Sequence, residues 1–378
     1  MKLHRTNCVN SRSADLQERD NRKVWTRFLV QVPLLGCLVF MSPVSATAQV
    51  IKPTMKELIA TAQTERVLTT HQSGRFGNPT LWQDIQAGMK AKYGIDLQLS
   101  GSPAAPSMGQ MLSVLIDDYK AGRKPARADI FSTGGEQLVQ LAEADILEKI
   151  DWKKYMPDLT SEEIAMGGAS IAVGLAPYTL VYNPQIVKDP PKSLEDLAQP
   201  RYKGKIYVLP YVYGFVQLGM TKGVKPTYEL FQKMVCNGNV AGTFRGGQLG
   251  RITSGEIPIF AFNGGIVDVE ELKAKGAPIE RSDLGGEFRV ATMEYVGVPK
   301  NNRSPNLATL ASLFMVSPEG QSIFYKYSAW DSPFREGSRI RKLFPKIDYI
   351  ETPEKVQANP EVYKKLYPEM VKLVERGC

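Results

Sequence analysis

Between residues 65 and 150, short apolar runs alternate with longer segments in which apolar residues recur every three or four positions. The short runs are typical of buried strands, and the longer period is typical of amphipathic helices. We expect strands at 67–70, 95–99 and 128–132, and helices at 78–94, around 111–119 and at 136–147. Asn78 and Pro79 suit the N-cap and first turn of the first of these helices. Three successive strand–helix units predict a parallel sheet.

After residue 170 the order of elements changes. Residues 170–183 form a long β-prone stretch broken at Pro177, which we interpret as a crossing between two lobes. A second series follows, with expected strands at 205–209 and 257–262 and expected helices at 215–221, 228–235 and 267–275. Ser193 and Asp196 are placed as a capping box. Residues 288–298 are the expected return strand, after which we expect only helices.

A chain that builds part of one lobe, leaves it and returns predicts two α/β lobes with parallel-type sheets, joined by two hinge crossings. We expect residues 49–175 to form the first part of lobe 1, 176–290 to form lobe 2, and 291–378 to return to lobe 1 and supply its C-terminal helices. Roughly 330 residues exceed what one hydrophobic core usually serves. Ligands of such sheets bind at the carboxyl ends of the strands, so two facing sets of loops predict a cleft.

The N-terminal residues 1–48 have the order of a secretory signal peptide. Basic residues at 19–27 precede an apolar stretch at 28–39, which is shorter than the ~20 residues of a membrane span. The small residues Ala46 and Ala48 predict cleavage before Gln49 and a periplasmic protein. Lipidation at Cys37 is the alternative, and a start codon further along the chain is also left open.

Charge and rare residues exclude several classes of protein. The whole chain has a formal net charge of +8, but without residues 1–48 it keeps 40 basic and 36 acidic residues, so we expect no nucleic-acid partner. His71 is then the only histidine, which excludes a zinc site of two or three histidines. Cys236 and Cys378 are the remaining cysteines. They are either a disulfide, as an oxidising compartment favours, or a buried thiol and a terminal one.

Catalytic signatures are absent from the sequence. It contains no GxSxG, GxGxxG, GKS or GKT motif, and one histidine would have to serve any catalytic triad. We therefore expect a binding protein without a cofactor and without enzymatic activity.

Several segments, in their order and spacing over most of residues 65–340, resemble the extracellular solute-binding proteins of ABC importers. The resemblance is to the type II periplasmic binding protein group that includes ferric-ion, polyamine and thiamine binders. The matching segments are Ala128–Gly134, Leu175–Asn183, Ser193–Leu197, Tyr202–Ile206, Leu272–Glu280, Val298–Lys300 and Ser317–Gln321.

The resemblance implies a monomer that closes its two lobes over a small molecule and delivers it to a membrane permease. A ligand-binding sensor for a membrane kinase would have a nearly identical sequence and stays an alternative. Ferric binders of the group usually carry adjacent tyrosines after the strand that corresponds to 257–262. Here Phe262-Asn263-Gly264-Gly265 stands at that position, which disfavours ferric iron as the ligand and leaves it as an alternative.

In lobe 1, the resemblance places ligand contacts in the loop after the first strand. His71 is expected there as a hydrogen-bonding group, and Arg75 could bind a carboxylate or phosphate with two parallel bonds or merely cap a surface turn. Ser132 and Thr133 end the third strand at a helix start, where backbone N–H groups attract anions, although a plain N-cap is an equal reading.

In lobe 2, Tyr211 and Tyr213 stand where many relatives have a small Ser/Thr/Gly-rich turn and could wall a pocket, or one of them could pack in the core. Arg245 is a second candidate for an anionic group, with a surface arginine as the alternative. Three further candidates follow from position: Tyr178, Asn263 and Glu294. Arginines from both lobes predict a small organic ligand that bears a carboxylate or phosphate.

Overall fold

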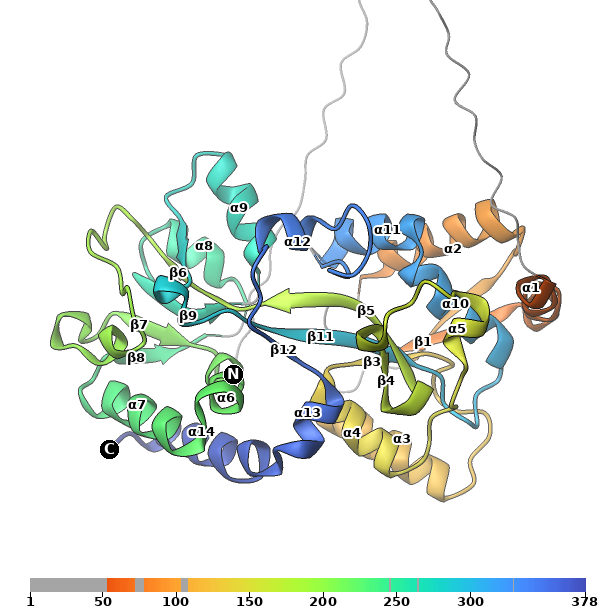
Figure 1. Ribbon diagram of the computed structural model, residues 1–378, viewed down its shortest axis with the longest axis horizontal. Coiled ribbons are helices and arrows are strands. Elements are labelled where there is room, and N and C mark those ends of the chain that lie inside the picture. Colours follow the sequence, from red (N-terminus) through yellow and green to blue (C-terminus); the bar gives the residue numbers. More distant parts are fainter. Residues whose placement is uncertain (1–52, 72–77, 103–107, 245, 264, 329) are drawn as a thin grey trace, which may run out of the picture. The chain divides into compact units, whose positions relative to one another are not determined.

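The computed structural model describes residues 53–71, 78–102, 108–244, 246–263, 265–328 and 330–378 of the chain, and the expected signal peptide and Arg75 and Arg245 lie outside these ranges (Figure 1). The described chain contains two main sheets, each with its own hydrophobic core. The predicted architecture of two α/β lobes is therefore confirmed.

Lobe 1 contains the elements before residue 178 and most of those after residue 289. Its strands are β1 (Val67–His71), β2 (Gln98–Ser102), β3 (Phe131–Thr133), β4 (Ile164–Ala165), β5 (Ser170–Pro177), β11 (Val290–Gly297) and β12 (Tyr349–Glu351). Its helices are α1 (Pro53–Glu65), α2 (Pro79–Tyr93), α3 (Met108–Lys120), α4 (Gly135–Glu143), α5 (Trp152–Tyr155), α10 (Pro305–Val316), α11 (Pro318–Ser328), α12 (Arg339–Leu343) and α13 (Pro353–Ala358).

Lobe 2 lies between the two hinge crossings along the chain. Its strands are β6 (Thr179–Tyr182), β7 (Ile206–Val208), β8 (Val240–Thr243), β9 (Ile259–Asn263) and β10 (Glu280–Ser282). Its helices are α6 (Tyr213–Lys222), α7 (Val224–Cys236), α8 (Gln248–Thr253) and α9 (Ile266–Ala274). The chain ends in a π-helical turn, η7 (Val362–Leu366), and α14 (Tyr367–Arg376).

Both sheets mix parallel and antiparallel pairs, so the expected parallel sheets are only partly correct. In lobe 1, β1 and β2 are parallel, whereas the long return strand β11 runs antiparallel to β3 and β5 and parallel to β12. In lobe 2 the order is β10-β6-β9-β7-β8, with parallel pairing only among β7, β8 and β9. The two hinge crossings touch, because the Tyr178 amide donates to the Val290 carbonyl at 3.0 Å.

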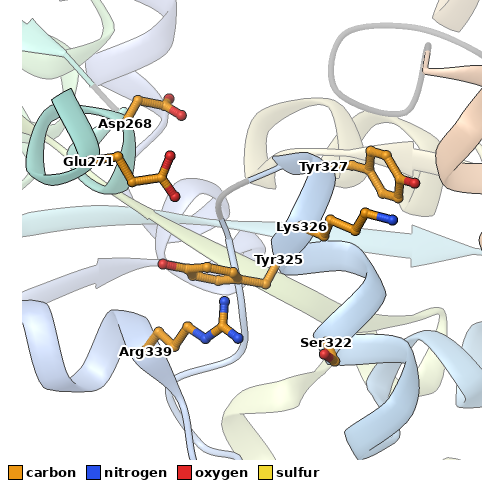
Figure 2. A pocket seen from close by; sticks show the side chains of 7 residues that line it. All are labelled: Asp268, Glu271, Ser322, Tyr325, Lys326, Tyr327 and Arg339. Carbon is orange, nitrogen blue, oxygen red and sulfur yellow. The ribbon is translucent and has the colours of Figure 1, made fainter. Parts of the chain in front are cut away.

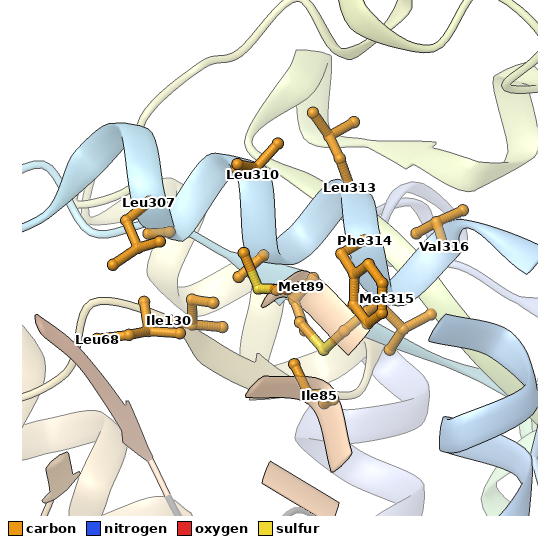
Figure 3. Close-up of a cluster of buried hydrophobic side chains, with 14 of the residues drawn as sticks. Leu68, Ile85, Met89, Ile130, Leu307, Leu310, Leu313, Phe314, Met315 and Val316 are labelled. Atoms are coloured by element: carbon orange, nitrogen blue, oxygen red, sulfur yellow. The ribbon is translucent and has the colours of Figure 1, made fainter. Parts of the chain in front are cut away.

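The core of lobe 1 is organised around α10, whose side chains from Leu307 to Val316 are all buried (Figure 3). This helix is apolar on every side because α1, α2, α11 and the strands surround it. Ser304 precedes it, and the Ser304 hydroxyl donates to the Val67 carbonyl on β1 at 2.6 Å. Asn78 caps α2 as predicted, since its side chain accepts a hydrogen bond from the Thr80 amide.

The C-terminal segment corrects two sequence-based expectations. β12 is a strand where only helices were expected. Val362, Leu366 and Met370 of η7 and α14 belong to the core of lobe 2, although residues 291–378 were all expected in lobe 1. The sequence pattern predicts an amphipathic helix here, but it does not say which lobe covers the apolar face.

A disulfide between Cys236 and Cys378 joins the end of α7 to the last residue of the chain, with 5.3 Å between the Cα atoms. Since α7 belongs to lobe 2, this bond holds α14 against that lobe. The chain therefore crosses between the lobes a third time, between α13 and η7.

Candidate functional site

Loops at the carboxyl ends of strands from both lobes meet at one place. In lobe 1, β3 ends at Thr133 and α4 begins at Gly135; in lobe 2, β7 ends at Val208 and α6 begins at Tyr213. The Gln137 amide nitrogen on α4 donates to the Tyr213 hydroxyl on α6 at 3.4 Å. Because ligands of α/β sheets bind at the carboxyl ends of the strands, this contact marks the candidate site.

Twelve side chains linked by hydrogen bonds, ring contacts or electrostatic influence form what we call the interlobe cluster. Its members are Ser132, Thr133, Glu136, Gln137, Tyr178, Tyr211, Tyr213, Gln217, Glu294, Glu351, Tyr363 and Tyr367. They come from both lobes and from the C-terminal segment.

Tyrosines from lobe 2 and from the C-terminal segment supply the aromatic part of the cluster. The Tyr211 and Tyr213 rings are 4.8 Å apart between centroids, and Tyr213 stacks on Tyr367 at 5.9 Å. These three side chains are half-buried, whereas Tyr178 at the hinge crossing is buried. Burial raises the pKa of the Tyr178 and Tyr213 hydroxyls, so both are neutral phenols at neutral pH.

Lobe 1 contributes hydroxyl, amide and carboxylate groups from β3, α4 and β11. The Ser132 hydroxyl donates to Glu294 Oε1, which ties β3 to the return strand. The Thr133 hydroxyl donates to Gln137 Oε1 at 3.3 Å, and Gln137 Nε2 donates to Glu136 Oε2 at 3.0 Å. Burial raises the pKa of the Glu136 carboxyl above its ordinary value.

Glu351 of β12 is buried in the cluster, with 3% of the residue exposed. Its Oε2 accepts hydrogen bonds from Gln217 Nε2 at 2.8 Å and from the Tyr363 hydroxyl at 2.6 Å, so one carboxyl joins lobe 1 to lobe 2 and to η7. A Cβ atom at Gly135 would lie 3.3 Å from Glu351 Oε1, which places this carboxyl beside the start of α4. Burial raises the pKa of the Glu351 carboxyl, and this effect exceeds the opposite effect of the hydrogen bonds from Tyr363 and Gln217.

The charged groups of the cluster are all carboxyls. Among the described residues, no ion pair includes Glu136 or Glu351, and no lysine or arginine acts on the pKa of either carboxyl. No group of three or more histidine, cysteine, aspartate or glutamate side chains that could hold a metal occurs in the part of the chain that the structure describes.

The structure brings together six of the ten predicted contact residues: Ser132, Thr133, Tyr178, Tyr211, Tyr213 and Glu294. Arg75 and Arg245 lie outside the described residues, and so do the side chains of His71 and Asn263, whose backbones belong to β1 and β9.

Six members of the cluster were not predicted: Glu136, Gln137, Gln217, Glu351, Tyr363 and Tyr367. Glu136 and Gln137 directly follow the Ser132–Gly135 turn, so extending that motif by one helical turn would have found them. The other four come from α6 and the C-terminal segment, for which the sequence offers no comparable signal.

A separate pocket of about 420 Å³ lies among α9, α11 and α12 (Figure 2). Asp268 and Glu271 of α9 face it from lobe 2, and Tyr325 and Lys326 of α11 and Arg339 of α12 face it from lobe 1. The Arg339 guanidinium lies 4.2 Å from the Tyr325 ring centroid. None of the predicted contact residues lines this pocket, and its mixed charges favour no single ligand class.

Comparison with known proteins gives a family match over about a third of the chain and a shared fold over most of it. The sequence model of the family described as bacterial extracellular solute-binding protein matches residues 127–254. No curated protein matches the sequence.

No helix among the described residues has the length and apolar character needed to cross a bilayer.

Three solved structures illustrate the shared fold. Iron-bound HitA from Pseudomonas aeruginosa has a TM-score of 0.66 and 21% identity, covering 80% of this chain and 99% of that one. AfuA from Actinobacillus pleuropneumoniae, with fructose-6-phosphate bound, has a TM-score of 0.63 and 18% identity, covering 82% and 99%. A periplasmic thiamin binding protein has a TM-score of 0.62 and 17% identity, covering 81% and 96%. At identities this low, the structural similarity shows a shared fold and leaves the ligand open.

Proposed function

We propose that this chain is a bacterial extracellular solute-binding protein that captures a small organic ligand by lobe closure in the periplasm. The match of residues 127–254 to that family and the type II periplasmic binding protein fold support the proposal. The loaded protein then delivers the ligand to the permease of an ABC importer. The observation that carries the proposal is the contact between Gln137 and Tyr213, because it joins the strand-end loops of both lobes at one cluster.

Lobe closure has a simple energetic basis in this proposal. A ligand that touches both lobes binds the closed state more tightly than the open one, and this difference in affinity shifts the population toward closure. Glu136 and Gln137 from lobe 1 and Tyr211 and Tyr213 from lobe 2 are the groups that such a ligand would bridge.

Purification under native conditions tests the proposal directly. Protein purified natively and then denatured should release a small molecule that mass spectrometry identifies. Adding this molecule back to stripped protein should raise the melting temperature and reduce the radius of gyration measured by X-ray scattering. Release of no molecule, together with no compaction by any tested solute, would contradict solute capture.

The expected carboxylate or phosphate of the ligand rests on Arg75 and Arg245. Replacing Arg245 with alanine should weaken binding of an anionic ligand by about tenfold or more, since a hydrogen bond to a charged group contributes about 1.5–3 kcal/mol. The melting temperature of the ligand-free protein should stay unchanged. Calorimetry gives the dissociation constants of the wild-type protein and the variant. Equal dissociation constants would show that Arg245 does not contact the ligand.

Ferric iron is the second candidate ligand, because the phenols of Tyr211 and Tyr213 lie in one cluster with the Glu136 carboxyl. Phenolate and carboxylate oxygens are hard ligands that suit Fe(III). Iron binding would produce a visible phenolate-to-iron absorption band on addition of a ferric salt. If the wild-type protein shows this band, the Tyr213→Phe variant should weaken or lose it. Absence of the band from the wild-type protein would leave the organic ligand as the better candidate.

A further inference from the structure

Two carboxyls of the interlobe cluster, those of Glu136 and Glu351, belong to no ion pair in the described part of the chain. Closing the lobes removes water from these groups, and a buried carboxylate without a cation is unfavourable. A ligand that brings a positive charge would therefore gain affinity here, and one that brings only negative charge would lose it.

A buried hydrogen-bond acceptor in the same cluster, Gln217 Oε1, also favours a ligand that donates hydrogen bonds. Gln217 is 1% exposed, and its Oε1 has no hydrogen-bond partner among the described residues, while its Nε2 donates to Glu351. Buried polar groups are nearly always satisfied, so an acceptor left without a donor indicates that a donor is missing from the cluster. A carboxylate cannot fill this role, because it carries no N–H or O–H group.

The aromatic members of the cluster also favour a cation. The rings of Tyr211, Tyr213 and Tyr367 lie within 4.8 to 5.9 Å of their neighbours and stay half-buried, so part of the ring surface is accessible. The face of a tyrosine ring carries negative potential and attracts ammonium groups, most strongly where water is excluded.

From these observations we propose that the ligand carries a protonated primary or secondary amine, whose N–H groups bind Glu136 and whose charge lies against the Tyr213 and Tyr367 rings. The inference rests on the proposed function and names the ligand class for that site. It requires N–H donors because the Glu136 carboxylate and the unpartnered Gln217 Oε1 are acceptors, so a quaternary ammonium group would fit less well. An acid group bound elsewhere by the predicted arginines is compatible with it and would make the ligand zwitterionic.

A panel of matched straight-chain compounds tests the inference on the full-length mature protein. The panel contains short α,ω-diamines and the ω-amino acids, diols and dicarboxylates of the same chain lengths. Amine-bearing compounds should raise the melting temperature and give measurable calorimetric binding, while the diols and dicarboxylates should not. ω-Amino acids should bind more tightly than diamines if the predicted arginines also contribute.

Variants of a single glutamate locate the amine. Glu136→Gln should weaken binding of the best amine by about tenfold, because it removes one charge-assisted hydrogen bond, and Glu136→Asp should retain part of the affinity. Glu57→Gln is the matched control, since Glu57 is exposed on α1 and outside the cluster. Melting curves of the ligand-free variants verify that each one folds.

Two results would overturn the amine inference. One is that no amine in the panel binds; the other is that dicarboxylates or diols bind best and Glu136→Gln leaves their affinity unchanged. In either case a molecule released from natively purified protein would still support solute capture, so failure of this inference is distinguishable from failure of the proposed function.

Discussion

Close packing of aromatic rings beneath the candidate site restricts which residues can start α6. The Phe262 ring at the end of β9 stacks on Phe288 with 3.7 Å between centroids, and Phe215 lies edge-on to it at 4.7 Å. Gly214, in the first turn of α6, lies directly on this group, since a Cβ atom there would be 2.1 Å from Phe262 Cβ. The absence of a side chain at Gly214 therefore lets α6 begin where Tyr213 reaches the interlobe cluster.

Gly214→Ala should destabilise the protein by about 1–3 kcal/mol, because extra volume in a closely packed core forces neighbours to move. It should also weaken ligand binding, since α6 and Tyr213 must shift with it. Gly109→Ala on α3 is the control, because a Cβ there meets no atom within 4 Å. Denaturant unfolding of both variants measures the difference, and equal free energies of unfolding would contradict the packing argument.

At the residue scale, the sequence predicted six members of the cluster, partly from the ends of strands and partly from position in the family resemblance. Ser132 and Thr133 were predicted because they end a strand at a helix start, where ligands bind, and Tyr213 was predicted from its position in the family resemblance. Glu351 and Tyr367 were missed, since their place beside α4 and Tyr213 depends on the tertiary path of the last thirty or so residues rather than on any local pattern.

At the scale of elements, the C-terminal helix α14 is held by its apolar side and by a covalent bond. Met370 is fully buried in the core of lobe 2, and Cys378 is bonded to Cys236 at the end of α7. The sequence predicted the helical periodicity and kept the disulfide as one of two alternatives. It could not decide between them, because the Cα separation that a disulfide needs is a property of the folded chain.

Cys378→Ser should lower the free energy of unfolding by about 2–4 kcal/mol, since the bond closes a loop with a sequence separation of 142 residues and restricts the unfolded chain. The loss should disappear when both proteins are compared in a reducing agent. Thermal and denaturant unfolding with and without reductant provide the measurement. A wild-type stability that does not respond to reductant would contradict this contribution.

For the whole molecule, the sequence predicted two lobes, their order along the chain and the hinge at Pro177, because a change in element order needs no knowledge of packing. It did not predict the antiparallel pairing of β11 with β3 and β5, since pairing is decided by which strands meet in space. Among the described strands, parallel pairing occurs only locally, at β1 with β2, at β11 with β12, and at β7 with β8 and β9.

Buried carboxyls at the lobe boundary give the molecule an unusual dependence of stability on pH. Burial raises the pKa of Glu136 and Glu351 above the value in the unfolded chain, so the folded state takes up their protons at higher pH. Stability should therefore rise as pH falls from neutral toward the ordinary glutamate pKa, and the gain is complete below it. Carboxyls with lowered pKa, such as Asp84 and Asp145, oppose this only at lower pH.

Glu351→Gln should raise the melting temperature at neutral pH and reduce its increase on mild acidification, because the amide is neutral and can donate to Gln217 Oε1. Melting curves of wild type and variant are measured from neutral pH down to the ordinary glutamate pKa. Subtracting the two melting temperatures at each pH cancels the contributions of the other titrating groups. A variant that is equally destabilised at every pH would show that the carboxylate form of Glu351 is the stabilising one.

The attachment of the last residues to lobe 2 also has a consequence for biosynthesis. Val362, Leu366 and Met370 are synthesised well after the rest of lobe 2, so lobe 2 lacks these side chains in its core until they have been translated. Cys236 likewise has no disulfide partner until Cys378, 142 residues later in the sequence, has been translated. A ribosome-bound nascent chain that ends before η7 should therefore expose an apolar surface on α6 and α7 to chaperones.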